Sequence, residues 1–98
     1  MKITRAFQDI NFEWDNKKAV SNLTKHSVSF ESACEAFFDP FFVLTDAGIA
    51  EGEQREAVIG MTIGWRLLFV VHVVVDDVVR IISARAATEH ERKHYEDQ

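Results

Sequence analysis

Arginine side chains gather in the second half of this sequence. Five of its six arginines lie there: Arg55, Arg66, Arg80, Arg85 and Arg92. A guanidinium group binds phosphate through two parallel hydrogen bonds and keeps its charge at any physiological pH. Several such groups on one surface can hold an RNA backbone and stabilise the extra charge of a phosphorane-like transition state. The arginines therefore indicate phosphate chemistry, and the competing interpretation is that they pair with surface carboxylates for little energetic gain.

Three groups close to these arginines in the sequence can exchange a proton. His72 titrates near neutral pH when it is exposed. Glu53 and Glu56 flank Arg55, and either carboxylate can act as a base or orient a guanidinium group. A histidine within a valine-rich strand is more often a core residue with a satisfied hydrogen bond, so both roles stay open for His72.

The stretch 65–85 must position most of these groups, and it predicts a β-hairpin. Two runs of β-branched and aromatic residues flank Asp76 and Asp77, which form the expected turn. Cross-strand pairs then sum to 153, so that residue 72 faces residue 81, 70 faces 83 and 68 faces 85. Alternation predicts that the face with Phe69 and Arg80 is the core, and that the face with His72 and Arg85 is a working surface.

A third strand at about 55–61 is expected to pair with the first strand of this hairpin. A tight connection near 62–65 makes those pairs sum to 127, so that Arg55 faces His72 and Met61 faces Arg66. This register predicts one sheet face that carries four groups able to act on phosphate: Arg55, Arg66, His72 and Arg85. Arg80 would lie on the opposite, core face, where it needs a carboxylate partner such as Glu13 or Asp15.

Capping residues predict three helices around this sheet. Asp15 opens a helix that ends near Lys25 and His26, and Ser29 opens a second helix over 30–38, which Asp39 and Pro40 terminate. Short strands are expected at 10–14 and 41–45, with an acidic loop over 46–54 and a frayed start or edge strand over 1–9. The capping box from Thr88 to Glu91 opens a polar helix that must dock through Tyr95 or onto a partner. The order predicts a two-layer α+β domain, with an antiparallel meander and helices on one sheet face.

Composition bounds the remaining possibilities. The chain has 98 residues, which suit one domain, and a net charge of −5, which argues against a general nucleic-acid binder. The longest apolar run is too short to cross a bilayer, and the first residues lack the apolar region of a signal peptide. The lone Cys34 cannot form an internal disulfide and is expected to be a small buried residue. These features indicate a protein of the cytoplasm.

Other candidate motifs carry more modest signals. His90, Glu91 and His94 match the H-E-x-x-H pattern of zinc hydrolases, but the motif leaves no room downstream for a third ligand, and Glu91 already has a capping role. We therefore favour a solvated helix face and expect no metal site. Lys25 with His26 can contact RNA or form a solvated helix end. Trp14 and Trp65 can stack on bases, although core packing is more common for tryptophan.

The sequence also resembles a known family over nearly its whole length, from Phe12 to Glu96. The blocks that carry the resemblance are Phe12-Glu13-Trp14-Asp15, Lys18, Asn22, Lys25-His26, Val28-Ser29-Phe30, Phe38-Asp39-Pro40, Glu53, Arg55, Gly60, Arg80-Ile81-Ile82-Ser83-Ala84-Arg85, Glu91-Arg92 and Tyr95-Glu96. In this order they are similar to the BrnT toxin family. The chain departs from the family pattern at Ser27, where a glycine is usual and would suit a left-handed helix end.

The resemblance implies a type II toxin with a RelE-like fold that cleaves RNA without a metal or other cofactor. It further implies neutralisation by a BrnA-like antitoxin, a ribbon-helix-helix protein through which the complex binds operator DNA. The family's matched polar positions fall on Glu53, Arg55, Arg80 and Arg85, and Arg66 precedes the central strand.

The first hypothesis is thus an endoribonuclease in which the RNA 2′-hydroxyl attacks the adjacent phosphate. Arg55, Arg66 and Arg85 bind the phosphate, and Glu53 or His72 handles the proton. The further candidate RNA contacts are Arg80, Arg92, Lys25 and His26. The alternative, which the acidic net charge favours, is a binding module that docks an antitoxin and tunes transcription.

Overall fold

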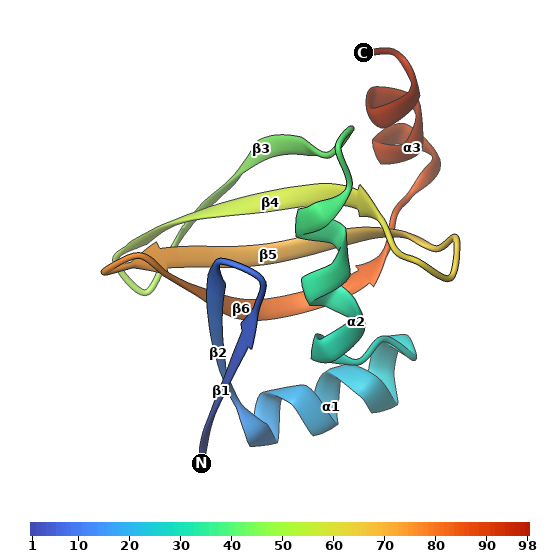
Figure 1. The fold of residues 1–98 in the computed structure, drawn as a ribbon. Coiled ribbons are helices and arrows are strands. Elements are labelled where there is room, and N and C mark those ends of the chain that lie inside the picture. Colours follow the sequence, from blue (N-terminus) through green and yellow to red (C-terminus); the bar gives the residue numbers. More distant parts are fainter.

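A single six-stranded sheet forms the centre of the molecule (Figure 1). The computed structural model describes residues 1–98. The strands are β1 (Lys2–Phe7), β2 (Ile10–Asp15), β3 (Val43–Ala50), β4 (Glu53–Met61), β5 (Leu67–Val75) and β6 (Val78–Ala86). They lie in the order β1-β2-β6-β5-β4-β3, and every neighbouring pair is antiparallel except β2 and β6, which run parallel. The last strand in the sequence therefore lies inside the sheet.

The helices are α1 (Asn16–His26), α2 (Phe30–Glu35) with a 3₁₀ turn η1 (Ala36–Phe38), and α3 (Glu89–Glu96). The three predicted caps are confirmed. The side chains of Asp15, Ser29 and Thr88 accept hydrogen bonds from the first turns of α1, α2 and α3, and Thr88 and Glu91 form the expected capping box. Ser27 ends α1 with φ 57° and ψ 32°, the left-handed conformation that glycine would adopt more easily. No helix is long and apolar enough to span a membrane.

The hydrophobic core lies between one face of the sheet and the helices α1 and α2 (Figure 1). Phe12 and Trp14 of β2 pack there against Phe30 of α2. From the central strands, Leu68, Val70, Ile81 and Ala84 join the same cluster, and Cys34 is buried as expected. The sequence-based assignment of the two faces is therefore wrong: α1 and α2 cover the face of Leu68 and Val70. The face of Phe69 and Arg80 is free of these two helices, although Ala57, Ile59 and Val73 on that side are buried.

The register between β4 and β5 places Arg55 on a different face from the one predicted. Residue pairs sum to 128 and not to 127, so that Glu56 faces His72 and Met61 faces Leu67. The connection spans the five residues 62–66, and the amide of Thr62 donates to the carbonyl of Arg66 at 2.9 Å. A shift of one residue moves every side chain of a strand to the other face. Arg55 therefore lies on the face opposite His72.

A β-bulge in the hairpin of β5 and β6 likewise moves Arg85 to the other face. The predicted pairs hold from Val75–Val78 to His72–Ile81, with sums of 153. Beyond them Val71 faces Ser83, because Ile82 is an extra residue in β6. The bulge reverses the alternation, so that Arg85 faces Phe69 and shares the uncovered side of the sheet with Arg80.

The segment 46–54 is not the predicted acidic loop. β3 continues to Ala50, turns at Glu51 and Gly52, and pairs with β4 from Glu53 onward. Glu51 and Gly52 have φ values of 53° and 76°, typical of a tight hairpin turn. The predicted edge strand at the start of the chain is present as β1, which pairs with β2.

Candidate active site

The uncovered face of the sheet carries three of the predicted arginines. Val58 faces the core, so Arg55 on the same strand faces the opposite way by alternation. Arg80 and Arg85 lie opposite Val73 and Phe69 of β5, which also point away from the helices. These three guanidinium groups, together with the carboxylates of β2 and β4 that reach the same side, form what we call the open-face site.

The open-face site has two parts. Val73 and Phe69 are four residues apart on β5, which at about 3.3 Å per residue separates the backbones of Arg80 and Arg85 by about 13 Å. Arg55 lies at the end of the sheet that also holds Arg80, since Glu56 pairs with His72. Arg55 and Arg80 therefore form one group and Arg85 another.

Arg80 connects three strands. Its Nε donates to Glu13 of β2 at 3.3 Å, and its Nη1 donates to Glu53 of β4 at 3.1 Å. Lys2 approaches the other oxygen of Glu13 at 3.0 Å. The hydrogen bond from Lys2 lowers the pKa of Glu13 against the opposing effect of partial burial, and Arg80 lowers it further. Of the two carboxylates expected as partners of Arg80, Glu13 and Asp15, it is Glu13 that forms the ion pair.

Arg55 differs from Arg80 because its Nε atom is buried and has no hydrogen-bond partner in the protein. A buried donor without a partner costs free energy, and such groups in native proteins call for an explanation. An anion could reach this donor only if the side chain turned toward solvent. Arg55 is also the one arginine of the open-face site that forms no ion pair, whereas Arg80 and Arg85 are held by carboxylates.

Arg85 is held from two sides. Both guanidinium Nη atoms donate to Glu91 of α3, at 2.8 and 2.9 Å, and the guanidinium carbon lies 4.3 Å from the centre of the Phe69 ring. The hydrogen bonds that Arg85 donates to Glu91 raise the pKa of Arg85 and lower the pKa of Glu91. The side chain of Arg85 is still 36% exposed, so its outer edge can contact a ligand.

The position of Glu91 depends on how α3 docks. No residue of α3 is buried, but the Tyr95 hydroxyl donates to Asp39 at 2.6 Å. Asp39 is buried and also accepts from the amides of Met61 and Phe41. Burial raises the pKa of Asp39, and these three hydrogen bonds outweigh it, so the net shift is downward. Burial and the neighbouring Asp39 raise the pKa of Tyr95 to about 12.

His72 lies away from the open-face site. Its side chain is 2% exposed, its ring centre is 4.9 Å from that of Phe37, and Nδ1 is 3.3 Å from the carbonyl of Val70. Burial lowers its pKa. The prediction that His72 shares a face with Arg55 and Arg85 is wrong, and His72 has the environment of a core histidine.

Arg66 is also separated from the open-face site. It lies in the loop before β5, and its Nη1 donates to the carbonyl of Ser27 at 2.9 Å, on the helix side of the sheet. The other predicted RNA contacts, Lys25, His26 and Arg92, lie at the end of α1 and on α3, where the first two are exposed. The predicted face of four groups is thus reduced to Arg55 and Arg85, with Arg80 added.

No group of three or more His, Cys, Asp or Glu side chains is arranged to hold a metal ion. His90 and His94 are exposed on α3, and Glu91 binds Arg85 and the amide of Thr88. The H-E-x-x-H pattern is therefore part of a solvated helix.

A groove of about 620 Å³ lies beside α2, on the side of the sheet that the helices cover. Its walls include Cys34, Phe38, Met61 and Ile63, and its acidic residues are Glu31, Glu35 and Asp39. No arginine, lysine or histidine lines it. The groove therefore has no part in an anion site.

Three residues of the arrangement were not predicted: Glu91 as the partner of Arg85, Phe69 beneath it, and Asp39 as the anchor of Tyr95. The capping box was visible in the sequence, but its glutamate serves both the helix and Arg85. The open face now offers fixed cations, an unpartnered donor at Arg55 and a carboxylate at Glu53. Such a set can bind a phosphodiester and receive a proton.

Comparison with known proteins identifies the family to which the chain belongs. A family model described as the ribonuclease toxin BrnT of type II toxin–antitoxin systems matches residues 14–91. Among solved structures, the Brucella abortus ribonuclease toxin BrnT is similar, with a TM-score of 0.52 and 23% sequence identity over 78% of this chain and 94% of that one. No curated protein matches. The family match covers most of the chain, including every strand of the central sheet from β3 to β6, and the chain therefore belongs to the BrnT family of ribonuclease toxins.

Proposed function

We propose that this protein is a metal-independent endoribonuclease whose active site is the open face of the sheet. A BrnT toxin of a type II system has RNA as its substrate and an antitoxin as its partner. On this proposal, the 2′-oxygen of the RNA forms a bond to the adjacent phosphorus while the bond to the 5′-oxygen breaks. The products are a 2′,3′-cyclic phosphate and a free 5′-hydroxyl.

The observation that carries the proposal is Arg55, with a buried Nε that lacks an acceptor. No carboxylate of the chain pairs with Arg55, so its guanidinium group can turn toward a phosphate oxygen, and the charge that develops on the phosphate would strengthen the bond. Glu53 lies on the same strand and is oriented by Arg80 at 3.1 Å. Glu53 takes the proton of the attacking 2′-hydroxyl, and the departing 5′-oxygen takes a proton from water. His72 has no part because it is buried on the other face.

Arg85 contacts the RNA strand at the other end of the open face. Its separation from Arg80 by about 13 Å means that the two ends hold different phosphates of one strand. Glu91 and Phe69 fix the guanidinium in one orientation, which reduces the entropy lost when RNA binds.

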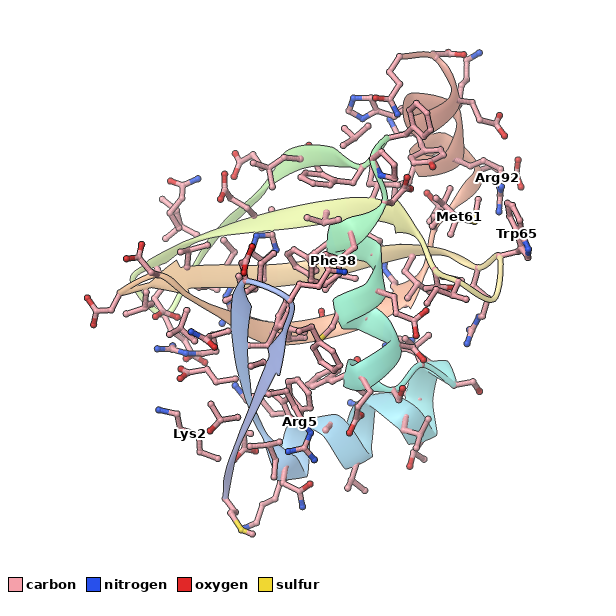
Figure 2. All side chains as sticks on the ribbon, viewed as in Figure 1. Lys2, Arg5, Phe38, Met61, Trp65 and Arg92 are labelled. Carbon is pink, nitrogen blue, oxygen red and sulfur yellow. The ribbon has the colours of Figure 1, made fainter.

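The test is RNA cleavage by purified protein in EDTA, with and without ribosomes. Arg55→Ala and Arg85→Ala are compared with the matched control Arg5→Ala. Arg5 lies on β1, where it pairs with the core residue Phe12, and it is far from the open face (Figure 2). We expect the first two variants to lose at least about 100-fold in cleavage rate, as when one donor to a transition-state charge is removed. Cleavage that all three variants retain would reject the site, and cleavage that EDTA abolishes would reject the metal-free mechanism.

A second candidate function is a catalytically weak module that docks its antitoxin and tunes transcription. Arg80 and Arg85 are both engaged by carboxylates of the chain itself, and the net charge is −5, which disfavours RNA binding. Expression without an antitoxin separates the two candidates, because only an active ribonuclease should arrest growth.

The remaining parts of the proposal follow from the family. We propose a BrnA-like ribbon-helix-helix antitoxin as the partner, with operator DNA bound only through the complex. We also propose a RelE-like fold in which residues 1–98 form one domain, and a cytoplasmic location where RNA and antitoxin are both present.

A further inference from the structure

Trp65 stands out among the side chains that the proposed mechanism does not use. It is 83% exposed, whereas the other tryptophan, Trp14, is 2% exposed in the core. Its φ of 65° lies in the left-handed region, where a bulky side chain is strained. Strained residues persist only where the surrounding structure holds them, and they are concentrated at functional sites.

The loop that displays Trp65 is held by hydrogen bonds at several points. The amide of Trp65 donates to the carbonyl of Thr62 at 3.0 Å, and the amide of Arg66 donates to the Thr62 hydroxyl at 3.1 Å. The amide of Ile63 donates to Glu35 of α2 at 2.9 Å. The exposure of Trp65 is therefore a property of an ordered loop.

Four basic side chains lie around this loop, although the whole chain is acidic. The bond from Arg66 to the carbonyl of Ser27 brings the loop beside the end of α1, where Lys25 and His26 are exposed. Arg92 lies at the same end of the molecule (Figure 2), because the bond from the Ala87 amide to the carbonyl of Leu67 joins the start of β5 to the segment before α3.

Two of the nearby carboxylates are engaged within the protein: Glu35 accepts from Ile63, and Glu91 binds Arg85. Glu89 of α3 is exposed. The particular feature of this end of the sheet is therefore an exposed indole ring among four basic side chains.

We propose that Trp65 is a base-stacking residue that binds an unpaired nucleotide of single-stranded RNA, while Lys25, His26, Arg66 and Arg92 contact the backbone. The inference rests on the proposed function, because it extends the path of the RNA strand that the open face cleaves. Stacking of a base on an aromatic ring is tolerant of sequence, and it requires an unstacked base. Trp65 therefore selects single-stranded RNA over duplex RNA and contributes little to sequence preference.

The test is the binding of a 2′-O-methyl RNA oligonucleotide about ten nucleotides long. The methyl group blocks attack by the 2′-oxygen, so that binding is measured without cleavage. Wild type, Trp65→Ala and Trp65→Phe are compared with Val74→Ala, a matched control in which an exposed apolar side chain is removed from the far end of β5. Binding is followed by the anisotropy of the labelled oligonucleotide and by the quenching of tryptophan emission. RNA cannot contact the buried Trp14, so the quenching reports on Trp65.

We expect Trp65→Ala to bind roughly 5- to 150-fold more weakly than the wild type, the range for loss of one base stack, and to lose the quenching. Trp65→Phe should recover most of the affinity because it keeps an aromatic face, and Val74→Ala should bind like the wild type. The melting temperature of Trp65→Ala should not fall, since the indole ring is exposed and its removal takes no side chain out of the core.

Two outcomes overturn the inference: equal binding by wild type and Trp65→Ala, or no binding by the wild type. Equal binding together with a smaller assembly in light scattering would assign Trp65 to contact between copies of the chain. The failure of the proposed function is distinguishable, because a wild type that binds through Trp65 and cuts no RNA leaves this inference intact. If Trp65→Ala binds and cuts like the wild type while Arg55→Ala is inactive, only the inference is lost.

Discussion

Replacing Tyr95 with phenylalanine removes a single oxygen atom, the one through which α3 is hydrogen-bonded to the buried Asp39. α3 has no buried residue, and its contacts with the rest of the protein include the bond from Tyr95 to Asp39 at 2.6 Å and the pair of Arg85 with Glu91. Without the hydroxyl, α3 is held by this ion pair at its first turn and by the bond from Gln98, just after the helix, to the carbonyl of Phe41. The change should therefore affect both stability and the orientation of Arg85.

The magnitude follows from the acceptor. A hydrogen bond to a charged group contributes about 1.5–3 kcal/mol. Asp39 keeps its bonds from the amides of Met61 and Phe41, so the carboxylate is not left without donors, and the lower end of the range applies. We expect a loss of about 1.5 kcal/mol in the free energy of unfolding. For a domain of this size, each kcal/mol lowers the melting temperature by about 4–8 °C.

Urea denaturation of Tyr95→Phe, Asp39→Asn and the double variant measures the coupling between the two side chains. Hydrogen exchange should show faster exchange of the α3 amides in Tyr95→Phe, since the helix undocks locally at lower cost. An unchanged free energy of unfolding together with unchanged exchange in α3 would refute the reasoning, because it would mean that the helix is held by other contacts.

The pH dependence gives an independent check with a definite sign. The pKa of Tyr95 is raised from 10.0 to about 12 in the folded protein, so its contribution is fully present below pH 10 and is lost as the pH rises toward 12. The pKa of Asp39 is lowered from 3.8, so its contribution is present above that value and is lost as the pH falls below it. The stability difference between wild type and Tyr95→Phe should therefore shrink at both extremes.

Three further predictions concern the scaffold. Ser27→Gly should raise the free energy of unfolding by up to about 1 kcal/mol in urea denaturation, because glycine adopts φ 57° without strain; a loss of stability would contradict this. Gly60→Ala should cost about 1–3 kcal/mol, since the added carbon would clash with the carbonyl of Ala36. In the control Gly64→Ala the added carbon makes only an ordinary contact with the Thr62 hydroxyl at 3.9 Å, so it should change little. In an NMR titration His72 should titrate below 6.5, so its burial contributes stability that is lost as the pH falls below that value; a higher midpoint would show that it is not buried.

The helix boundaries could be predicted from the sequence because the signals are local. Asp15, Ser29 and Thr88 each bond to an amide three residues away, and a sequence displays that spacing directly. The hairpin turn at Asp76 and Asp77 was predictable for the same reason. These contacts do not depend on how distant strands meet.

Strand register was not predictable, because it depends on single residues whose effect is seen only in three dimensions. The loop before Leu67 shifts β4 by one residue, and Ile82 inserts one residue into β6. Each shift moves an arginine to the other face. Both shifts act in the same direction, so Arg55 and Arg85 still share a face as predicted, but His72 does not lie with them.

The candidate site was therefore predicted by residue type and only partly by geometry. Phosphate chemistry needs guanidinium groups, and the sequence has few of them, so Arg55, Arg80 and Arg85 were identifiable. The partners of Arg80 are Glu13 and Glu53, which lie 67 and 27 residues away in the chain. The partner of Arg85 is Glu91, which lies 6 residues away. Only the folded sheet shows which carboxylates meet which arginines.

The parallel pairing of β2 with β6 has a consequence for synthesis. β2 emerges from the ribosome early, but its inner neighbour in the sheet is the last strand to be made. Until residue 86 is free, β2 can pair only with β1, and the hairpin of β3 with β4 remains separate from it. Contacts between segments so distant in the chain form slowly. Because Arg80 and Arg85 lie on β6, a nascent chain has no assembled arginine face, and the protein acquires its cationic surface only as translation of the domain ends.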